Sequence, residues 1–195
     1  MRVVSGSARG SKLLAPPGTA VRPTSDRVRE AVFNSLGSLG VVLDASVLDL
    51  FAGSGALGIE ALSRGANDCT FCESDPRAAG VIRENLSRTR TAGSARVVVG
   101  DALALLSSGG PLEAVSVDLV VADPPYAFDR WDELLELLDT TGAQVVVAES
   151  DRRVEETPRW RELRHRTYGG TTVTILERSR VLDDEGPHPS QERHP

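Results

Sequence analysis

The stretch LDLFAGSGALGIEA, residues 48–61, predicts a strand, a glycine-rich loop and the first turns of a helix. An apolar run precedes the loop, and the helix is expected to begin at about Leu57. Gly53, Gly55 and Gly58 match the pattern G-x-G-x-x-G, in which glycines let the backbone approach a ligand at a helix N-terminus. The match is weak evidence by itself, because several nucleotide-binding classes share it. No G-K-[ST] follows, so the stretch is not a lysine-bearing phosphate loop.

Around this stretch, apolar runs alternate with helical stretches along most of the chain. The clearest helix is RWDELLELLD (130–139), in which apolar residues follow Trp131 at i+3, i+4 and i+7. Nearly continuous Val and Leu runs separated by amphipathic helices indicate a parallel sheet covered on both faces, which is a doubly wound α/β domain. Its expected strands are SVLDLF (46–51), DCTFCE (68–73), ARVVVG (95–100), VDLVVA (117–122) and AQVVVAE (143–149).

The last two expected strands, 162–169 and 171–178, have almost no residues between them. A link that short cannot hold a crossover helix, so the two strands should be antiparallel neighbours. An antiparallel hairpin that closes an otherwise parallel sheet distinguishes this chain from a dehydrogenase-type Rossmann domain. We expect the domain to span residues 25–179. Residues 180–195 are polar and rich in proline, and they are expected to be a disordered tail.

Residues 1–24 precede this domain and contain two short extended segments joined by a turn rich in glycine and serine. We expect them to form a small β-hairpin arm. A helix should follow, with Ser25 as its N-cap and apolar residues at helical spacing from Val28. Gly37 and Gly40 are expected to end it.

The net charge of −6 is unevenly distributed. Residues 1–30 carry six cations and two carboxylates, a net charge of +4, so the remainder carries −10. An acidic body with a basic arm is expected when one end of a protein contacts a polyanion. Lys12 is the only lysine, so the number of arginines alone also fits biased coding, and the asymmetry is the stronger signal.

Several other classes of protein fit the sequence poorly. No run of about 18 apolar residues occurs and the N-terminus lacks the order of a signal peptide, so we expect a soluble, cytoplasmic protein. Cys69 and Cys72 form C-x-x-C, but on a strand they point to opposite faces. The histidines His165, His188 and His194 have no cysteines at ligand spacing, and no metal site is predicted.

Two acids follow successive expected strands. Glu73 ends the strand after the glycine loop, where an acid can accept hydrogen bonds from both ribose hydroxyls of an adenosine ligand. A solvated acid at a strand end is the alternative. Asp101 follows the third strand, where its carboxylate or the amide of Ala102 can contact adenine. Asp101 is also a good helix N-cap, and both roles can hold together.

The segment Asp123-Pro124-Pro125-Tyr126 follows a buried strand and presents mainly hydrogen-bond acceptors. The Asp123 carboxylate and the Pro124 carbonyl can both point at one NH₂ group. An amine on a base ring is a poor nucleophile because its lone pair is delocalised, and two acceptors help to localise that pair. Tyr126 can stack on the base, a contact worth roughly 1–3 kcal/mol. Alternatively, Pro-Pro merely ends the strand.

Taken in order, the glycine loop, Glu73, Asp101 and DPPY resemble an S-adenosylmethionine-dependent methyltransferase of class I acting on an exocyclic amine. RVVSGSARGSKL, RPTSDRVREAVFNSL and YGGTTVTILER narrow the resemblance to the RsmD family, over residues 2–177. That family methylates N2 of one guanine in small-subunit (16S) ribosomal RNA. The link SDRRVEETPRW (150–160) is short for the helix that many methyltransferases have there.

The resemblance also implies site residues, a cofactor and partners. S-adenosylmethionine is the expected cofactor, and 16S ribosomal RNA within an assembling small subunit is the expected partner of a monomer. The implied catalytic residues are Asp123, Pro124, Pro125 and Tyr126. The implied cofactor-binding residues are Arg22, Thr24, Asp49, Phe51, Ala52, Gly53, Ser54, Gly55, Glu73, Ser74, Asp101, Ala102 and Asp123. The implied RNA-binding residues are Arg2, Arg9, Lys12 and Arg27.

Three other functions stay open at this point. An adenine-N6 methyltransferase acting on DNA or RNA could share the cofactor loop and the acceptor segment, but it would normally need a further recognition domain. A nicotinamide-dependent oxidoreductase fits the glycine loop but not DPPY or the terminal hairpin. A ribosome-assembly factor without turnover is the third, and the intact acids Glu73, Asp101 and Asp123 argue against it.

Overall fold

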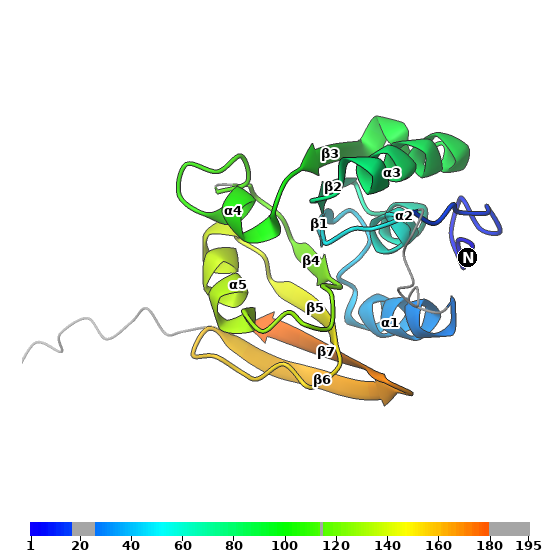
Figure 1. The fold of residues 1–195 in the computed structure, drawn as a ribbon. Helices are drawn as coiled ribbons and strands as arrows, with labels where there is room; N and C mark the ends of the chain where they lie inside the picture. The colour runs from blue at the N-terminus through cyan, green and yellow to red at the C-terminus, as the bar shows by residue number, and fades with distance from the viewer. Residues whose placement is uncertain (17–25, 114, 180–195) are drawn as a thin grey trace, which may run out of the picture.

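The structure is a computed structural model that describes residues 1–16, 26–113 and 115–179. Seven strands form one sheet in the order β3-β2-β1-β4-β5-β7-β6 (Figure 1). β1 to β5 run parallel, whereas β7 is antiparallel to both of its neighbours. The strands are β1 (Ser46–Leu50), β2 (Asp68–Glu73), β3 (Ala95–Val99), β4 (Leu119–Ala122), β5 (Val145–Ser150), β6 (Trp160–Tyr168) and β7 (Thr171–Arg178). The predicted mostly parallel sheet with an antiparallel hairpin is confirmed.

Helices cover both faces of the sheet, as predicted for a doubly wound domain. In Figure 1, α1, α2 and α3 lie on one face and α4 and α5 on the other. The helices are α1 (Asp26–Leu39), α2 (Ala56–Ser63), α3 (Pro76–Thr89), α4 (Ala102–Leu106) and α5 (Trp131–Leu138), with short 3₁₀ turns at Ala92–Ser94 and Asp139–Thr141. Among the described residues, no helix is long and apolar enough to span a membrane.

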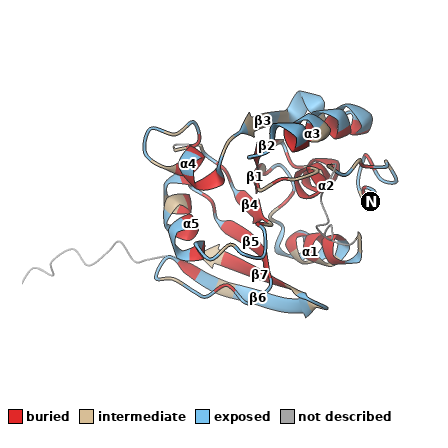
Figure 2. Ribbon diagram, in the orientation of Figure 1, coloured by how far each residue is buried: buried red, intermediate tan, exposed pale blue. Residues whose placement is uncertain are grey.

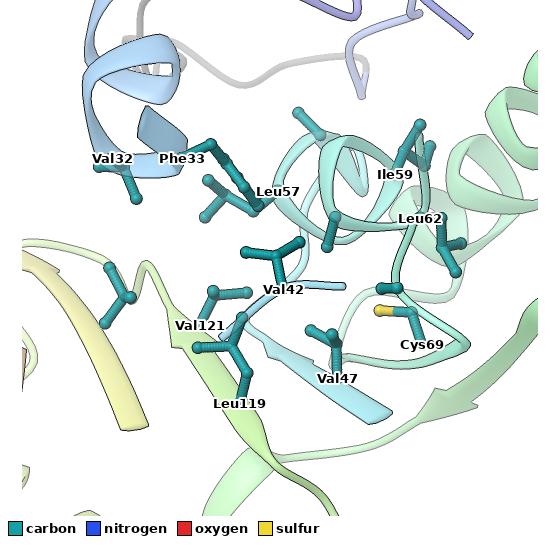
Figure 3. Close-up of a cluster of buried hydrophobic side chains, with 14 of the residues drawn as sticks. Val32, Phe33, Val42, Val47, Leu57, Ile59, Leu62, Cys69, Leu119 and Val121 are labelled. Atoms are coloured by element: carbon teal, nitrogen blue, oxygen red, sulfur yellow. The ribbon is translucent and has the colours of Figure 1, made fainter. Parts of the chain in front are cut away.

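The core consists of two apolar clusters, one on each side of the sheet, and the central strands β1, β4 and β5 are buried except at Ser46, the first residue of β1 (Figure 2). Val32 and Phe33 of α1 pack with Leu57 of α2 and Val121 of β4 in the first cluster (Figure 3). Cys69 belongs to this cluster and Cys72 to the other. The expectation that the two thiols point to opposite faces is therefore confirmed.

The hairpin of β6 and β7 completes the sheet without a helix before it. Residues 151–159 contain no helix, as the short link suggested. Trp160 begins β6 fully buried, and its indole N–H donates to the carbonyl of Leu135 in α5 at 3.0 Å. This anchor ties the hairpin to α5, because a buried indole N–H needs an acceptor.

Within residues 1–16, the described part of the N-terminal arm, the chain reverses direction with one antiparallel bridge, between Arg2 and Lys12, and these residues form no regular strand. Its amides bond elsewhere: those of Val4 and Ser5 donate to the carboxylate of Glu60 in α2, at 2.8 and 3.0 Å. The arm is thus a loop packed on α2. It cannot form a longer ladder while those donors are used by a helix side chain.

Several element ends differ from the sequence expectations by one or two residues. Gly37 lies inside α1, which continues to Leu39, and Gly40 follows in the left-handed region with φ 71°. β1 ends at Leu50, one residue earlier than expected, because Phe51 has φ 58°. A positive φ is incompatible with an extended strand, so Phe51 ends β1. Ser25 and the tail 180–195 lie outside the described residues.

Candidate functional site

Strand register brings the predicted site residues to one edge of the sheet. Leu50 of β1 is paired with Cys72 of β2 and with Ala122 of β4. The next residues along these strands, Phe51, Glu73 and Asp123, therefore share one row at the carboxyl ends of the strands, with neighbouring strands about 4.8 Å apart. At β1 the order of the strands reverses, because β2 lies on one side of it and β4 on the other. Open α/β sheets bind ligands at the carboxyl ends of the strands at such a point.

The glycine loop leaves this row and enters α2. Gly53 and Gly55 have φ 55° and 77°, a conformation that side-chain-bearing residues rarely adopt, and Gly55 is the N-cap of α2. A Cβ on Gly58 would lie 2.4 Å from Cε1 of Phe71 and 2.6 Å from Sγ of Cys69. The third glycine thus permits close packing of α2 on β2, as it does in dinucleotide-binding loops.

Asp49 of β1 is hydrogen-bonded to the first turn of α2, just after the glycine loop. Its side chain is buried, and Oδ2 accepts the Gly58 N–H at 2.8 Å. Burial raises the pKa of this carboxyl well above its usual range, the Gly58 hydrogen bond opposes the rise, and the charges of Asp123 and Glu73 add to it. Asp49 in β1 lies two residues before Phe51, so it is near the row that contains Glu73 and Asp123. The observed contact of Asp49 is with the helix, and its contact with a cofactor stays a prediction.

Glu73 connects the loop to the start of α3. Its Oε2 accepts the Gly53 N–H at 2.7 Å and its Oε1 accepts the Asp75 N–H at 2.8 Å. The hydroxyl of Ser74 donates to Oε1 at 3.4 Å. A carboxylate has about four lone-pair positions and three are used here, so Glu73 can accept one hydrogen bond from a diol, and a second if the long Ser74 contact is given up.

Asp101 caps α4, which confirms the plainer of its two predicted roles. Its Oδ1 accepts the Ala104 N–H at 3.0 Å, and the side chain is exposed beside the buried Ala102. The preceding Gly100 donates its N–H to the Glu73 carbonyl at 3.0 Å. Asp101 therefore lies next to the row of strand ends, and adenine recognition by Asp101 and Ala102 stays a prediction.

The acceptor segment continues from β4 at the centre of this edge. The Asp123 N–H donates to the Leu50 carbonyl at 3.4 Å, Asp123 is half-buried and Pro124 is buried. Tyr126 is 50% exposed, and its hydroxyl lies 3.1 Å from Oγ1 of Thr171, at the start of β7. The hairpin tip thus holds an exposed aromatic ring next to the acceptors.

Three aromatic rings, each in contact with the next, pack against the acceptor segment. Phe128 contacts Phe51 and Trp131 edge to face, with centroids 5.2 and 5.3 Å apart. The Phe128 N–H also donates to the Pro125 carbonyl at 2.8 Å. Such pairs contribute roughly 0.5–1.5 kcal/mol beyond area burial. The acceptor segment, the glycine loop and α5 are therefore packed as one unit.

The basic arm is attached to the same loop. Asn85 of α3 donates to the carbonyls of Leu14 and Ser54 at 3.0 and 2.9 Å, and it accepts the Leu14 N–H at 2.8 Å. One buried amide thereby links the arm to the glycine loop. The expected RNA-binding residues are all exposed: Arg2, Arg9, Lys12 and Arg27. Arg22 and Thr24 lie outside the described residues.

Two cavities lie away from this edge. One of about 320 Å³ lies between the arm and α1, lined among others by Gly6, Phe33 and Arg64. The other, of about 510 Å³, adjoins Arg161 and Glu177. Neither includes a predicted cofactor residue, so the candidate site is defined by the strand ends. Within the described part of the chain, no cluster of His, Cys, Asp and Glu could hold a metal ion.

The carboxylates and the open loop at this edge of the sheet suit an adenosine cofactor that carries a positive charge. Glu73 and Asp123 offer acceptors for hydroxyls and negative charge beside a sulfonium. Nothing lies within 3.4 Å of a Cβ built on Gly53, so the loop is open there. The residues present therefore fit S-adenosylmethionine: Gly53 to Gly55 would contact its methionine part, Glu73 its ribose and Asp101 its base.

Comparison with known proteins gives the family. The family model described as "Conserved hypothetical protein 95" matches residues 1–177. The chain belongs to this family. The resemblance to the RsmD family is confirmed by an Escherichia coli relative named "Ribosomal RNA small subunit methyltransferase D", 42% identical over 142 residues, which are 73% of this chain and 68% of the relative.

Two further relatives cover nearly the whole chain. "Putative rRNA methyltransferase YlbH" of Bacillus subtilis is 39% identical over 186 residues, 91% of this chain and 99% of that protein. The solved structure of "Putative methyltransferase yhhF from Escherichia coli" superposes with a TM-score of 0.79 at 36% identity, over 91% of this chain and 97% of that one. This chain therefore shares one fold with a solved relative over about nine-tenths of its length.

Three contacts of this RsmD-family chain escaped the sequence analysis: those of Glu60, Asn85 and Thr171. Glu60 stands in the otherwise apolar helix ALGIEALS, and Asn85 lies on the buried face of α3. A polar residue within an apolar stripe was the available signal, because such residues are rarely buried without partners. For Thr171 no local signal existed, because its partner Tyr126 is 45 residues away.

Proposed function

We propose that this chain transfers a methyl group from S-adenosylmethionine to the exocyclic N2 amine of a guanine in small-subunit (16S) ribosomal RNA. The observation that carries the proposal is the row of Phe51, Glu73 and Asp123, which sets DPPY beside a glycine loop suited to the cofactor. The names of the E. coli and B. subtilis relatives support ribosomal RNA as the substrate.

The chain's own residues would act mainly by alignment. When bound, the cofactor supplies a methyl group on a sulfonium that is electrophilic without help from the protein. The Asp123 carboxylate and the Pro124 carbonyl accept the two N–H groups of the amine and turn its lone pair toward the methyl carbon. Good orientation contributes about 7–11 kcal/mol to reactions of this kind.

The base must leave its stack to reach these acceptors, at a cost of a few kcal/mol. Stacking on Tyr126 offsets roughly 1–3 kcal/mol of that cost. Thr171 holds the ring in place through its hydroxyl contact with Tyr126. After transfer the nitrogen is cationic and acidic, so Asp123 or water takes one proton and no strong general base is needed.

The proposal is tested by incubating the protein with isotopically labelled S-adenosylmethionine and separate pools of 16S ribosomal RNA, small subunits, transfer RNA and DNA. We expect label in the small-subunit RNA, recovered by mass spectrometry as N2-methylguanosine. N6-methyladenosine would favour the adenine-specific alternative, and label confined to transfer RNA or DNA would contradict the substrate. Comparing free RNA with small subunits shows whether the substrate is an assembling particle.

A further inference from the structure

The edge hairpin carries two kinds of exposed arginine. Arg161 forms an ion pair with Glu177, and Arg153, just before β6, forms one with Glu162. Arg164 instead donates to the hydroxyl of Ser35 in α1 at 2.7 Å. Among the described residues, Arg164 has no carboxylate partner, and Arg166 has neither a hydrogen-bond nor an ion-pair partner.

Arg164 and Arg166, the two arginines without a carboxylate partner among the described residues, lie on one face of the sheet and are called the unpaired arginines below. Arg164 is opposite Ile175 of β7 and Arg166 is opposite Val173. Directly opposed residues on antiparallel strands point to the same face. Val173 and Ile175 belong to the core cluster under α1, and the contact of Arg164 with α1 agrees. The two guanidinium groups therefore form a row along β6 beside α1, about 7 Å apart along the strand.

This row leads to the candidate site. Tyr168, one step beyond Arg166 on the same face, is opposite Thr171, whose hydroxyl contacts Tyr126. Residues two apart on a strand are separated by about 7 Å. The path from Tyr126 over the hairpin tip to Arg166 and Arg164 is therefore short and continuous. Figure 1 shows β6 as the outermost strand, with no element beyond it.

We propose that the row of Arg164 and Arg166 binds phosphates of the RNA strand that flanks the target base, a proposal that rests on the proposed function. A protein of net charge −6 repels RNA as a whole, so contact needs cations that no carboxylate already neutralises. The planar fork of a guanidinium group matches phosphate geometry. Arg153 and Arg161 have the same chemistry but are already paired.

The test compares two double variants of equal charge change. Arg164→Gln with Arg166→Gln removes the unpaired row, and Arg153→Gln with Arg161→Gln is the matched control on the same hairpin. Affinity for labelled 16S ribosomal RNA is measured between 50 and 200 mM salt. Each lost phosphate contact lowers the salt slope by about 0.7, so the first variant should lose about 1.4. Between 50 and 200 mM salt, the factor by which its affinity falls should therefore be about seven times smaller than the factor for the wild type.

Other readouts separate docking from folding. The single variant Arg166→Gln breaks no contact seen among the described residues, so it should fold normally and lose about 0.7 of slope. In methyl transfer, KM for RNA should rise while kcat at saturating RNA and the affinity for S-adenosylmethionine stay unchanged. The control pair should lose less than half of the slope lost by the unpaired row.

An unchanged slope in the Arg164 and Arg166 variants would overturn the proposal. An equal loss in both double variants would overturn it too, because overall charge and not this row would then govern binding. A wild-type protein that binds 16S ribosomal RNA but transfers no methyl group would refute the proposed function alone, and the slopes would still decide the docking surface.

Discussion

At the residue scale, the candidate site depends on a few positions whose chemistry is narrowly constrained. Asp123 follows β4 in the row with Glu73, and it is the only acid of the acceptor segment 123–126. Its proposed task is to accept a hydrogen bond from an amine, which a neutral amide performs poorly because its NH₂ end donates.

We expect Asp123→Asn to retain S-adenosylmethionine binding, weakened at most modestly because Glu73 and the glycine loop remain, but to lose most of its turnover, on the order of 10²-fold or more, as for other misplaced positioning groups. Single-turnover methyl transfer and cofactor binding by calorimetry measure the two effects. Asp129→Asn, in the exposed turn beyond the segment, is the control and should retain activity. Full activity of Asp123→Asn would refute the acceptor role.

Gly58 tests whether close packing of α2 on β2 requires a glycine. A Cβ there would overlap Phe71 and Cys69, so Gly58→Ala should destabilise the protein by about 1–3 kcal/mol. Gly80 in α3 is the matched control, because a Cβ there meets nothing within 4 Å. Gly80→Ala should stabilise by roughly 0.5–1 kcal/mol through helix propensity. Urea unfolding measures the change in the free energy of unfolding for each variant. Equal changes in the two variants would contradict the packing argument.

At the scale of elements, the arm is attached to α2 by a buried charge cluster. The Glu60 side chain is fully buried and accepts the amides of Val4 and Ser5. It also contacts the guanidinium groups of Arg29, at 3.5 Å, and Arg64, at 2.8 Å. Arg29, itself fully buried, donates to the Arg2 carbonyl. The cluster joins the arm, α1 and α2.

We expect Glu60→Gln to cost up to about 3–5 kcal/mol of unfolding free energy, because it removes the fully buried carboxylate beside Arg29 and leaves the partly exposed Asp26, 2.8 Å away, as the carboxylate partner of Arg29. The arm should also become sensitive to limited proteolysis. Glu84→Gln in α3 is the control: Glu84 pairs with Arg88 at the same i, i+4 spacing, but both side chains are about half exposed. Exposed helix pairs contribute only about 0.3–0.5 kcal/mol. Similar losses in the two variants would contradict the importance of burial.

At the scale of the whole molecule, the sheet separates two cores, and each contains one free cysteine. Burial raises the pKa of Cys72 to about 12, and the charges of Glu73, Asp101 and Asp49 add to the rise. Burial also raises the pKa of Cys69 well above its usual value. The folded state therefore favours the protonated thiols.

Because these folded-state pKa values are raised, their contribution to stability is present below the pKa of an unfolded thiol, about 8.5, and is lost as the pH rises toward 12. We expect the free energy of unfolding to fall between pH 9 and 11 by up to about 1.4 kcal/mol per pH unit for each thiol. Urea unfolding measures it. Cys72→Ala should show a shallower decline, and an identical pH slope in the variant would contradict the assignment.

Much of the fold was predictable because it depends on local spacing. Alternating apolar runs predicted all five parallel strands, and the residue spacing of RWDELLELLD predicted the four buried residues of α5. The short link predicted the antiparallel hairpin. The candidate site was equally readable, since its members directly follow strands, and parallel strands bring their carboxyl ends to one edge.

The sequence by itself placed Phe51, Glu73 and Asp123 at the ends of expected strands, to within one or two residues, because the periodicity of apolar residues is a local property. The register between strands, which is tertiary, brought the three residues into one row. Only the tertiary structure decided where the arm packs, that Glu60 and Asn85 hold it, and that Thr171 holds Tyr126. These contacts join residues 45 to 71 positions apart. A contact at such a separation depends on how helices and strands pack in space, and no pattern of neighbouring residues encodes it.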